Sequence, residues 1–150
     1  MNATVDDSVI SRIERGIYTV LNQLAGVLRF LRKDLDAAAE RYAVAAREQH
    51  EKGEFHEALA SYKKALIRSR KKEYLVDAGE ICYALGEYDD AEKFFTLALK
   101  LDYFDSRALK GMAYALHAAG NIDHAVYFYF KYLDIQKNDY DALLNLGFGQ

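Results

Sequence analysis

The stretch GEYDDAEKFFTLAL, residues 86–99, decides the fold, because the chain contains two counterparts of it. GEFHEALASYKKAL begins at Gly53 and GNIDHAVYFYFKYL begins at Gly120, so the three leading glycines are spaced by 33 and then 34 residues. A fixed period of this length indicates a solenoid of stacked repeats.

The three copies share a pattern of small and large side chains. An alanine follows each glycine by five positions (Ala58, Ala91, Ala125), and an aromatic residue follows it by nine (Tyr62, Phe95, Tyr129). Small residues let a neighbouring helix approach closely, and the large one fills the remaining gap. Apolar residues also stand eleven positions before each glycine, at Tyr42, Leu75 and Leu109. We therefore expect an all-α solenoid in which each glycine joins two helices into an αα-hairpin.

This pattern resembles the tetratricopeptide repeat (TPR). The resemblance implies repeats at about 39–71, 72–105 and 106–139, followed by the first helix of a fourth at 140–150. The chain departs from the family pattern in having no proline, and in carrying Tyr132 where earlier copies have Ala65 and Ala98. Tyr132 suggests looser packing or an exposed aromatic surface. An apolar helix at the end of a solenoid needs a partner, so we expect either a fragment of a longer repeat protein or a single docking helix.

A separate amphipathic helix is expected before the repeats, in residues 1–36, with the repeat domain occupying 37–150. Its apolar residues follow a 3,4 spacing through three heptads: Ile10, Ile13, Ile17, Val20, Leu24, Val27 and Leu31. Asp7 or Ser8 is expected to cap its start, and Asp34 or Asp36 to mark a change of direction. This seam predicts either a cap on the first repeat or a coiled-coil dimerisation helix.

The composition supports no catalytic or metal site. A net charge of −3 offers no general attraction to nucleic acid. The lone Cys82 faces inward in the repeat register, and the four histidines (His50, His56, His117, His124) lack metal-ligand spacing. No export signal or charge-free stretch long enough to span a bilayer is present. We expect a cytoplasmic chain with no enzymatic activity and no cofactor.

The TPR resemblance implies a partner-binding groove formed by the first helix of each repeat. Its register assigns to that groove Arg47, His50, Val76, Glu80, Tyr83, Arg107, Lys110, Tyr114, His117, Leu144 and Phe148. Tyrosines beside basic residues suit a protein segment with apolar anchors and some negative charge. Some family members hold a C-terminal carboxylate with lysines and asparagines. Here Ala43, Arg47, Asp77 and Glu80 occupy such positions, which argues against that clamp.

We therefore expect a scaffold or adaptor that binds protein partners. LDYFDSR, residues 101–107, is similar to the class II translocator chaperones of type III secretion, which implies a secreted translocator as an alternative client and again a possible homodimer. Tyr127 and Phe130 replace smaller or polar residues and predict a second contact surface. A basic cluster between Lys63 and Lys72 leaves nucleic-acid binding as an alternative of another class, although the macrodipole alone accounts for cations there.

Overall fold

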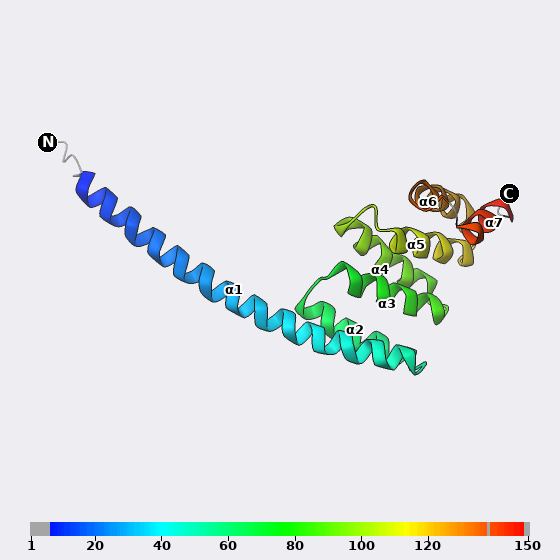
Figure 1. Cartoon of the computed structure of the whole chain (residues 1–150), viewed down its shortest axis with the longest axis horizontal. Helices are drawn as coiled ribbons and strands as arrows, with labels where there is room; N and C mark the ends of the chain where they lie inside the picture. Colours follow the sequence, from blue (N-terminus) through cyan, green and yellow to red (C-terminus); the bar gives the residue numbers. More distant parts are fainter. Residues whose placement is uncertain (1–6, 138, 149–150) are drawn as a thin grey trace. The chain divides into compact units, whose positions relative to one another are not determined.

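The computed structural model describes residues 7–137 and 139–148, and every regular element in them is a helix (Figure 1). The helices are α1 (Asp7–Glu51), α2 (Phe55–Arg68), α3 (Lys72–Ala84), α4 (Tyr88–Leu101), α5 (Ser106–Ala118), α6 (Ile122–Ile135) and α7 (Tyr140–Phe148). The chain forms two compact units, residues 1–37 and 38–150, and α1 contributes to both. The predicted all-α architecture of three hairpins and a further single helix is confirmed.

The three repeat glycines make the same turn. Gly53, Gly86 and Gly120 have φ values of 80°, 78° and 82°, in the left-handed region where glycine has no Cβ penalty. In each turn the amide after the glycine donates to a carbonyl five residues back, for example Glu87 to Cys82 at 2.9 Å. This is the Schellman arrangement, which satisfies the carbonyls at a helix end. The glycines therefore end α1, α3 and α5 at the predicted points.

Aspartates start two of the repeat helices in this proline-free chain. The Asp105 carboxylate accepts a hydrogen bond from the backbone amide of Ala108 at 2.8 Å, and Asp139 accepts one from Ala142 at 3.1 Å. A side-chain acceptor at this position satisfies an amide donor that has no partner within the helix. The two caps are 34 residues apart, so they belong to the repeat pattern and define the starts of α5 and α7.

The core of the repeat unit follows the predicted alternation of small and large residues. The alanine five positions after each turn glycine and the aromatic residue nine positions after it are at most 1% exposed in all three repeats. Phe95 lies between two helix-interior glycines: a Cβ built on Gly79 would lie 2.7 Å from its ring, and one built on Gly111 would overlap it. Gly79 and Gly111 are therefore the sites at which α3 and α5 make room for the Phe95 ring.

Two local expectations are wrong. Tyr132 is 6% exposed, because its hydroxyl donates to the Asp139 carboxylate and its ring packs into the core, so neither looser packing nor an exposed surface results there. Helix α1 includes Asp34 and Asp36, where a change of direction was expected. An aspartate caps a helix only where the backbone amides after it lack helical partners. These aspartates lie inside a continuous helix.

Cys82 is fully buried in α3, as predicted, and burial raises the pKa of its thiol to about 11. The thiolate is the reactive species, and a pKa two units above 9 reduces its fraction on the order of 100-fold. We expect a thiol-specific chromogenic reagent to modify the native protein at least that much more slowly than the urea-unfolded protein. Similar rates in the two states would contradict the buried position.

Candidate functional site

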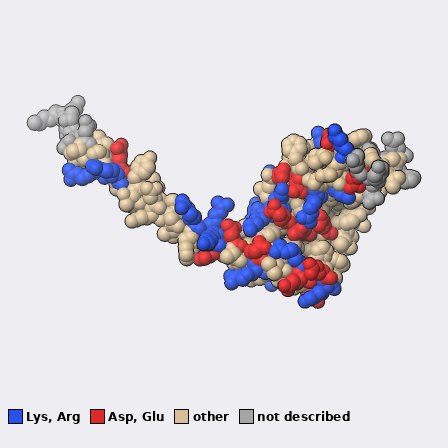
Figure 2. Space-filling model, in the orientation of Figure 1, with Lys and Arg blue, Asp and Glu red and all other residues tan. Residues whose placement is uncertain are grey.

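The sequence assigned the groove to the first helix of each repeat, which corresponds to residues 38–51 of α1, then α3, α5 and α7. α3 contacts α5 directly as well as packing on α4. On the face shown in Figure 2, acidic and basic side chains lie side by side over the repeat unit. The groove combines two kinds of chemistry, an aromatic pocket and a set of ion pairs.

The aromatic pocket brings together four of the predicted residues, Tyr83, Tyr114, His117 and Leu144. Ala118, Tyr129 and Asn145 complete its lining. The ring centroids of Tyr83 and Tyr114 are 6.4 Å apart, and those of Tyr114 and Tyr129 are 5.7 Å apart. Rings at these separations attract one another. They form a continuous aromatic run across α3, α5 and α6.

Tyr129 forms the floor of this pocket, a role that the register did not reveal. It comes from α6, the second helix of its hairpin, whereas the register assigned only first helices to the groove. Its side chain is 1% exposed. Its hydroxyl lies 3.2 Å from Nδ1 of His117, and burial raises its pKa, so the hydroxyl stays protonated near neutrality. Sequence reasoning used Tyr129 only as a core residue. Its hydroxyl nevertheless lies within hydrogen-bonding distance of His117, and both residues line the pocket.

Arg107 is the centre of the ion pairs in the groove. One of its terminal nitrogens lies 2.7 Å from Asp77 Oδ1 and 2.7 Å from Glu80 Oε2, which joins α5 to α3. Asp77 also accepts a hydrogen bond of 2.9 Å from the buried Tyr62 hydroxyl of α2. Hydrogen bonding to Glu80 is the main cause of the raised pKa of Arg107. The predicted residues Glu80 and Arg107 are thus adjacent, and they neutralise each other.

Glu40 forms a second polar centre at the first repeat. It accepts a 2.6 Å hydrogen bond from the Tyr74 hydroxyl and pairs with Arg47 at 2.7 Å and with Lys71 at 3.6 Å. The hydrogen bond from Tyr74, followed by that from Arg47, lowers the pKa of Glu40 to about 2. The predicted groove residue Arg47 therefore already has an anionic partner within the protein.

A third polar centre fastens α7 to the repeat before it. Lys110 lies 2.7 Å from Asp139 Oδ2, and the same carboxylate accepts the Tyr132 hydroxyl. The Lys110 ammonium also lies 5.6 Å from the ring centroid of Tyr114 and 5.5 Å from that of Tyr132. Lys110 is therefore held between a carboxylate and two aromatic faces.

The remaining predicted groove residues differ in their positions. Val76 is 1% exposed because it packs into the core of the repeat unit, so its assignment to the partner-binding surface is wrong. His50 is exposed, with its ring centroid 5.5 Å from that of Phe55. The Phe148 side chain lies outside the described residues. Among the side chains that are described, no group of histidine, cysteine and carboxylate residues could hold a metal ion.

Acidification is expected to destabilise the repeat unit through Glu40 and Asp139. Their pKa values are lowered from ordinary values of 4.5 and 3.8, Asp139 chiefly by hydrogen bonding to Lys110, so the unfolded chain binds these protons more tightly. The stabilisation from these two carboxylates is complete at pH values above their ordinary pKa values. It is lost as the pH falls toward their lowered pKa values in the folded protein. Urea unfolding at pH 7, 5, 3 and 2 should give midpoints that fall mainly below pH 5.

Asp139→Asn should lower the free energy of unfolding at pH 7 by about 1–2 kcal/mol, because hydrogen bonds to a charged group are lost. The variant should also show a weaker dependence on acid pH than the wild type. Equal stability of the wild type at pH 7 and pH 3 would contradict this account.

Other surfaces carry the residues that the groove does not use. Tyr127 and Phe130 are 48% and 55% exposed, and the hydroxyls of Tyr103 and Tyr127 lie 2.8 Å apart. Part of the predicted basic cluster forms ion pairs within the protein, since Lys72 pairs with Asp102 at 2.8 Å and with Asp105 at 2.9 Å. An apolar hollow next to this cluster is lined by Lys63, Leu66, Ile67, Arg70, Leu75, Phe94, Leu97, Lys100 and Leu101.

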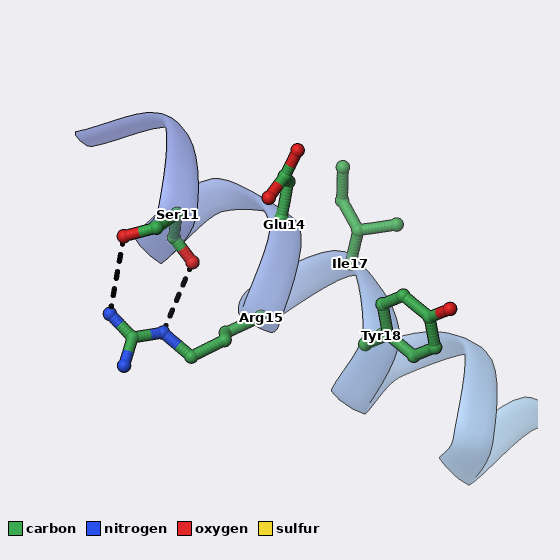
Figure 3. Close-up of a pocket in the computed structure, with 5 residues that line it drawn as sticks. All are labelled: Ser11, Glu14, Arg15, Ile17 and Tyr18. Atoms are coloured by element: carbon green, nitrogen blue, oxygen red, sulfur yellow. Dashed lines mark hydrogen bonds between the residues drawn. The ribbon is translucent and has the colours of Figure 1, made fainter. Parts of the chain in front are cut away.

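An open hollow also lies along α1 in the N-terminal unit. Figure 3 shows its lining of Ser11, Glu14, Arg15, Ile17 and Tyr18, all from one helix. Arg15 Nε donates to the Ser11 carbonyl at 3.0 Å. A hollow bounded by a single helix encloses no ligand, so it is part of an open helix surface. No helix in the described parts of the chain combines the length and apolarity needed to cross a bilayer.

Comparisons with known proteins agree with this geometry. Residues 72–105 match the sequence profile described as tetratricopeptide repeat. An 81-residue segment, 54% of the chain, is 33% identical to the TPR repeat-containing protein MJ1428 of Methanocaldococcus jannaschii, and it spans only 14% of that protein.

Solved structures of the same architecture cover most of the chain. The first TPR of Spaghetti (RPAP3) bound to the HSP90 peptide SRMEEVD aligns with a TM-score of 0.73 at 18% identity, covering 76% of this chain and 91% of that one. The Yersinia enterocolitica type III secretion chaperone SycD, in complex with a peptide of the translocator YopD, aligns at 0.69 and 17% identity, covering 73% and 90%. Residues 72–105 are therefore a tetratricopeptide repeat, and the hairpins around it give the chain a tetratricopeptide-repeat fold.

Proposed function

We propose that this chain is a non-enzymatic scaffold or adaptor that binds a segment of a partner protein in its groove. Tetratricopeptide-repeat domains are protein-interaction modules, and similar structures hold peptides. The observation that carries the proposal is the aromatic pocket of Tyr83, Tyr114, Tyr129, His117 and Leu144. Aromatic and aliphatic groups that line an open pocket can bury an apolar side chain of a partner.

The pairing of charges in and beside the predicted groove supports a narrower class of partner than the sequence did. Four cations, Arg47, Lys71, Arg107 and Lys110, lie against four anions, Glu40, Asp77, Glu80 and Asp139. A charged partner would have to compete with these internal pairs. We infer that the partner segment offers an aromatic or aliphatic anchor and little net charge, in place of the negative charge first expected.

The same charges disfavour a C-terminal carboxylate as the bound group. Asp77 and Glu80 would lie next to such a carboxylate, and like charges at short distance repel. Arg107, the nearest cation, is already held by both. Binding of the SRMEEVD type, which the Spaghetti structure contains, is therefore not proposed for this chain.

Selection of random peptides on this 150-residue chain, followed by amide hydrogen exchange of the complex, tests the proposal. Selected peptides should share an apolar anchor and have a net charge near zero. Protection from exchange should increase in α3 and α5, whose residues line the pocket. If protection increases only around Tyr127 and Phe130 of α6, the groove assignment is wrong.

A second candidate is a chaperone of a secreted translocator, which the similarity to SycD and the LDYFDSR stretch support. Such a chaperone holds an extended apolar client, so co-expression with a candidate client should yield one stoichiometric complex. Recovery of several unrelated structural partners would instead favour a scaffold. Nucleic-acid binding has the least support, because Lys71 and Lys72 of the basic cluster are engaged by carboxylates.

A further inference from the structure

The N-terminal unit presents a long apolar stripe on α1. Seven residues of the heptad seam and four neighbours form it: Val9, Ile10, Ile13, Ile17, Val20, Leu21, Leu24, Val27, Leu28, Leu31 and Leu35. Each is between 41% and 65% exposed. At 3.6 residues per turn, all eleven fall within an arc of about 120°. We call this surface the N-terminal stripe.

The area of the stripe is large enough for a stable interface. At roughly 60–80 Å² of apolar surface for each half-exposed aliphatic side chain, the stripe presents on the order of 700 Å². The largest apolar patch of an ordinary monomer is about 300–600 Å². A standard protein interface buries about 800 Å² on each partner. The stripe therefore has the size that one side of a dimer interface requires.

The charges around the stripe indicate protein rather than anionic lipid as its cover. Figure 3 shows Glu14 and Ile17 extending from the same side of α1, while Arg15 folds back to Ser11 on the other side. Glu14 borders one edge of the stripe, and Asp34 follows Leu31 at the next seam position. Arg32 lies on the same edge as Glu14, so the edges of the stripe carry both signs of charge, whereas a helix that lies on an anionic bilayer is typically flanked by lysine and arginine.

The same charges select an orientation for two copies. In a parallel pair the two Asp34 side chains would face each other across the seam, which is unfavourable. In an antiparallel pair centred on residue 23, Glu14 of one copy is level with Arg32 of the other, and Arg12 is level with Asp34. In an antiparallel pair each edge of the stripe meets the same edge of the other copy. By symmetry the Glu14–Arg32 pair and the Arg12–Asp34 pair each form twice. Opposite charges then flank the apolar seam along both edges.

We propose that the N-terminal stripe is the interface of an antiparallel homodimer. The proposal is independent of what the groove binds, since every residue in it lies in the N-terminal unit. Dimerisation buries the stripes of both copies against each other. In the antiparallel direction Glu14 lies near Arg32 of the other copy, and Asp34 lies near its Arg12.

Sedimentation of the full chain over a range of concentrations tests the association. The wild type should be a dimer, and Ile17→Asp with Leu24→Asp should weaken dimerisation at least 100-fold while the repeats keep their thermal unfolding midpoint. Thr19→Asp with Asn22→Asp is the matched control, because it adds the same charges to the opposite face of the same helix. The control should remain dimeric.

Three results would overturn the proposal. The first is a wild type that stays monomeric while the stripe variant lowers the unfolding midpoint of the repeats, which would make the helix a cap. The second is a monomeric wild type that binds phosphatidylserine vesicles through the stripe. The third is a dimer that the stripe variant leaves intact.

Disulfide cross-linking tests the orientation, on a Cys82→Ala background that removes the buried native thiol. Chains with Ile13→Cys alone should not cross-link under mild oxidation, since the two positions lie at opposite ends of an antiparallel pair. Mixed with chains carrying Leu31→Cys, a seam position within one helical turn of the partner's residue 13 in this register, they should form cross-linked heterodimers. Efficient cross-linking of Ile13→Cys to itself would establish a parallel pair and overturn the proposal.

Discussion

Gly111→Ala is expected to destabilise the repeat unit by about 1–2 kcal/mol, although alanine is the better helix former. The new methyl group would overlap the Phe95 ring, which is fully buried and is also in close contact with Gly79 on its other side. Overpacking a well-packed core by this amount costs about 1–3 kcal/mol and outweighs the gain of up to about 1 kcal/mol in helix propensity. Urea unfolding followed by circular dichroism measures the difference.

Gly26→Ala is the matched control, because nothing lies within 4 Å of a Cβ built there. That variant should be as stable as the wild type or slightly more stable. Replacing the ring by a smaller side chain, in Phe95→Leu, should recover part of the stability that Gly111→Ala loses. A double-mutant cycle should give a coupling free energy of at least about 1 kcal/mol. Additive effects of the two substitutions would show that the ring and the glycine do not compete for the same space.

Tyr83→Ala combined with Tyr114→Ala is expected to weaken binding of a groove ligand at least about thirtyfold, as measured by calorimetry with a peptide selected on the wild type. Anchor residues of an interface contribute about 2 kcal/mol or more each time they fill or form a central pocket. Tyr114 also packs against Tyr129, so a modest loss of stability should accompany the change. Affinity must therefore be measured well below the unfolding midpoint.

Tyr127→Ala combined with Phe130→Ala is the control, since it removes two equally large aromatic side chains from the other exposed surface. This variant should bind the peptide like the wild type. Loss of binding in this control, with normal binding by the groove variant, would move the recognition site to α6. Lys110→Glu should have its main effect on stability, because it would set a second carboxylate against Asp139.

The parts of the fold that recur three times could be predicted from the sequence. The glycine turns and the alternation of Ala91 with Phe95 stand out because independent copies agree. The adjacency of Tyr83 and Tyr114 followed from the same register, but the pocket that they form with Tyr129 did not. The packing of Phe95 against Gly79 and Gly111 was missed. Its signal was present, since a glycine inside a helix and away from a turn indicates a close approach.

The ion pairs could not be predicted, because they depend on how one repeat rotates against the next. Arg107 reaches Asp77 across 30 residues, and Lys110 reaches Asp139 across 29. A single sequence shows these charges but not which of them meet. Tyr132 was misjudged for the same reason: its partner Asp139 lies on the following turn, and the hydrogen bond makes burial of the tyrosine favourable.

The paired charges of the groove have a consequence for the kinetics of association. Long-range attraction of a ligand requires an uncompensated field, and each groove cation here lies within 4 Å of an anion. Encounter with a partner should therefore proceed without steering, at about 10⁵–10⁶ M⁻¹s⁻¹, and should change little with ionic strength. Partners would then be distinguished by how long they remain bound, a property that the fit of an anchor in the aromatic pocket controls.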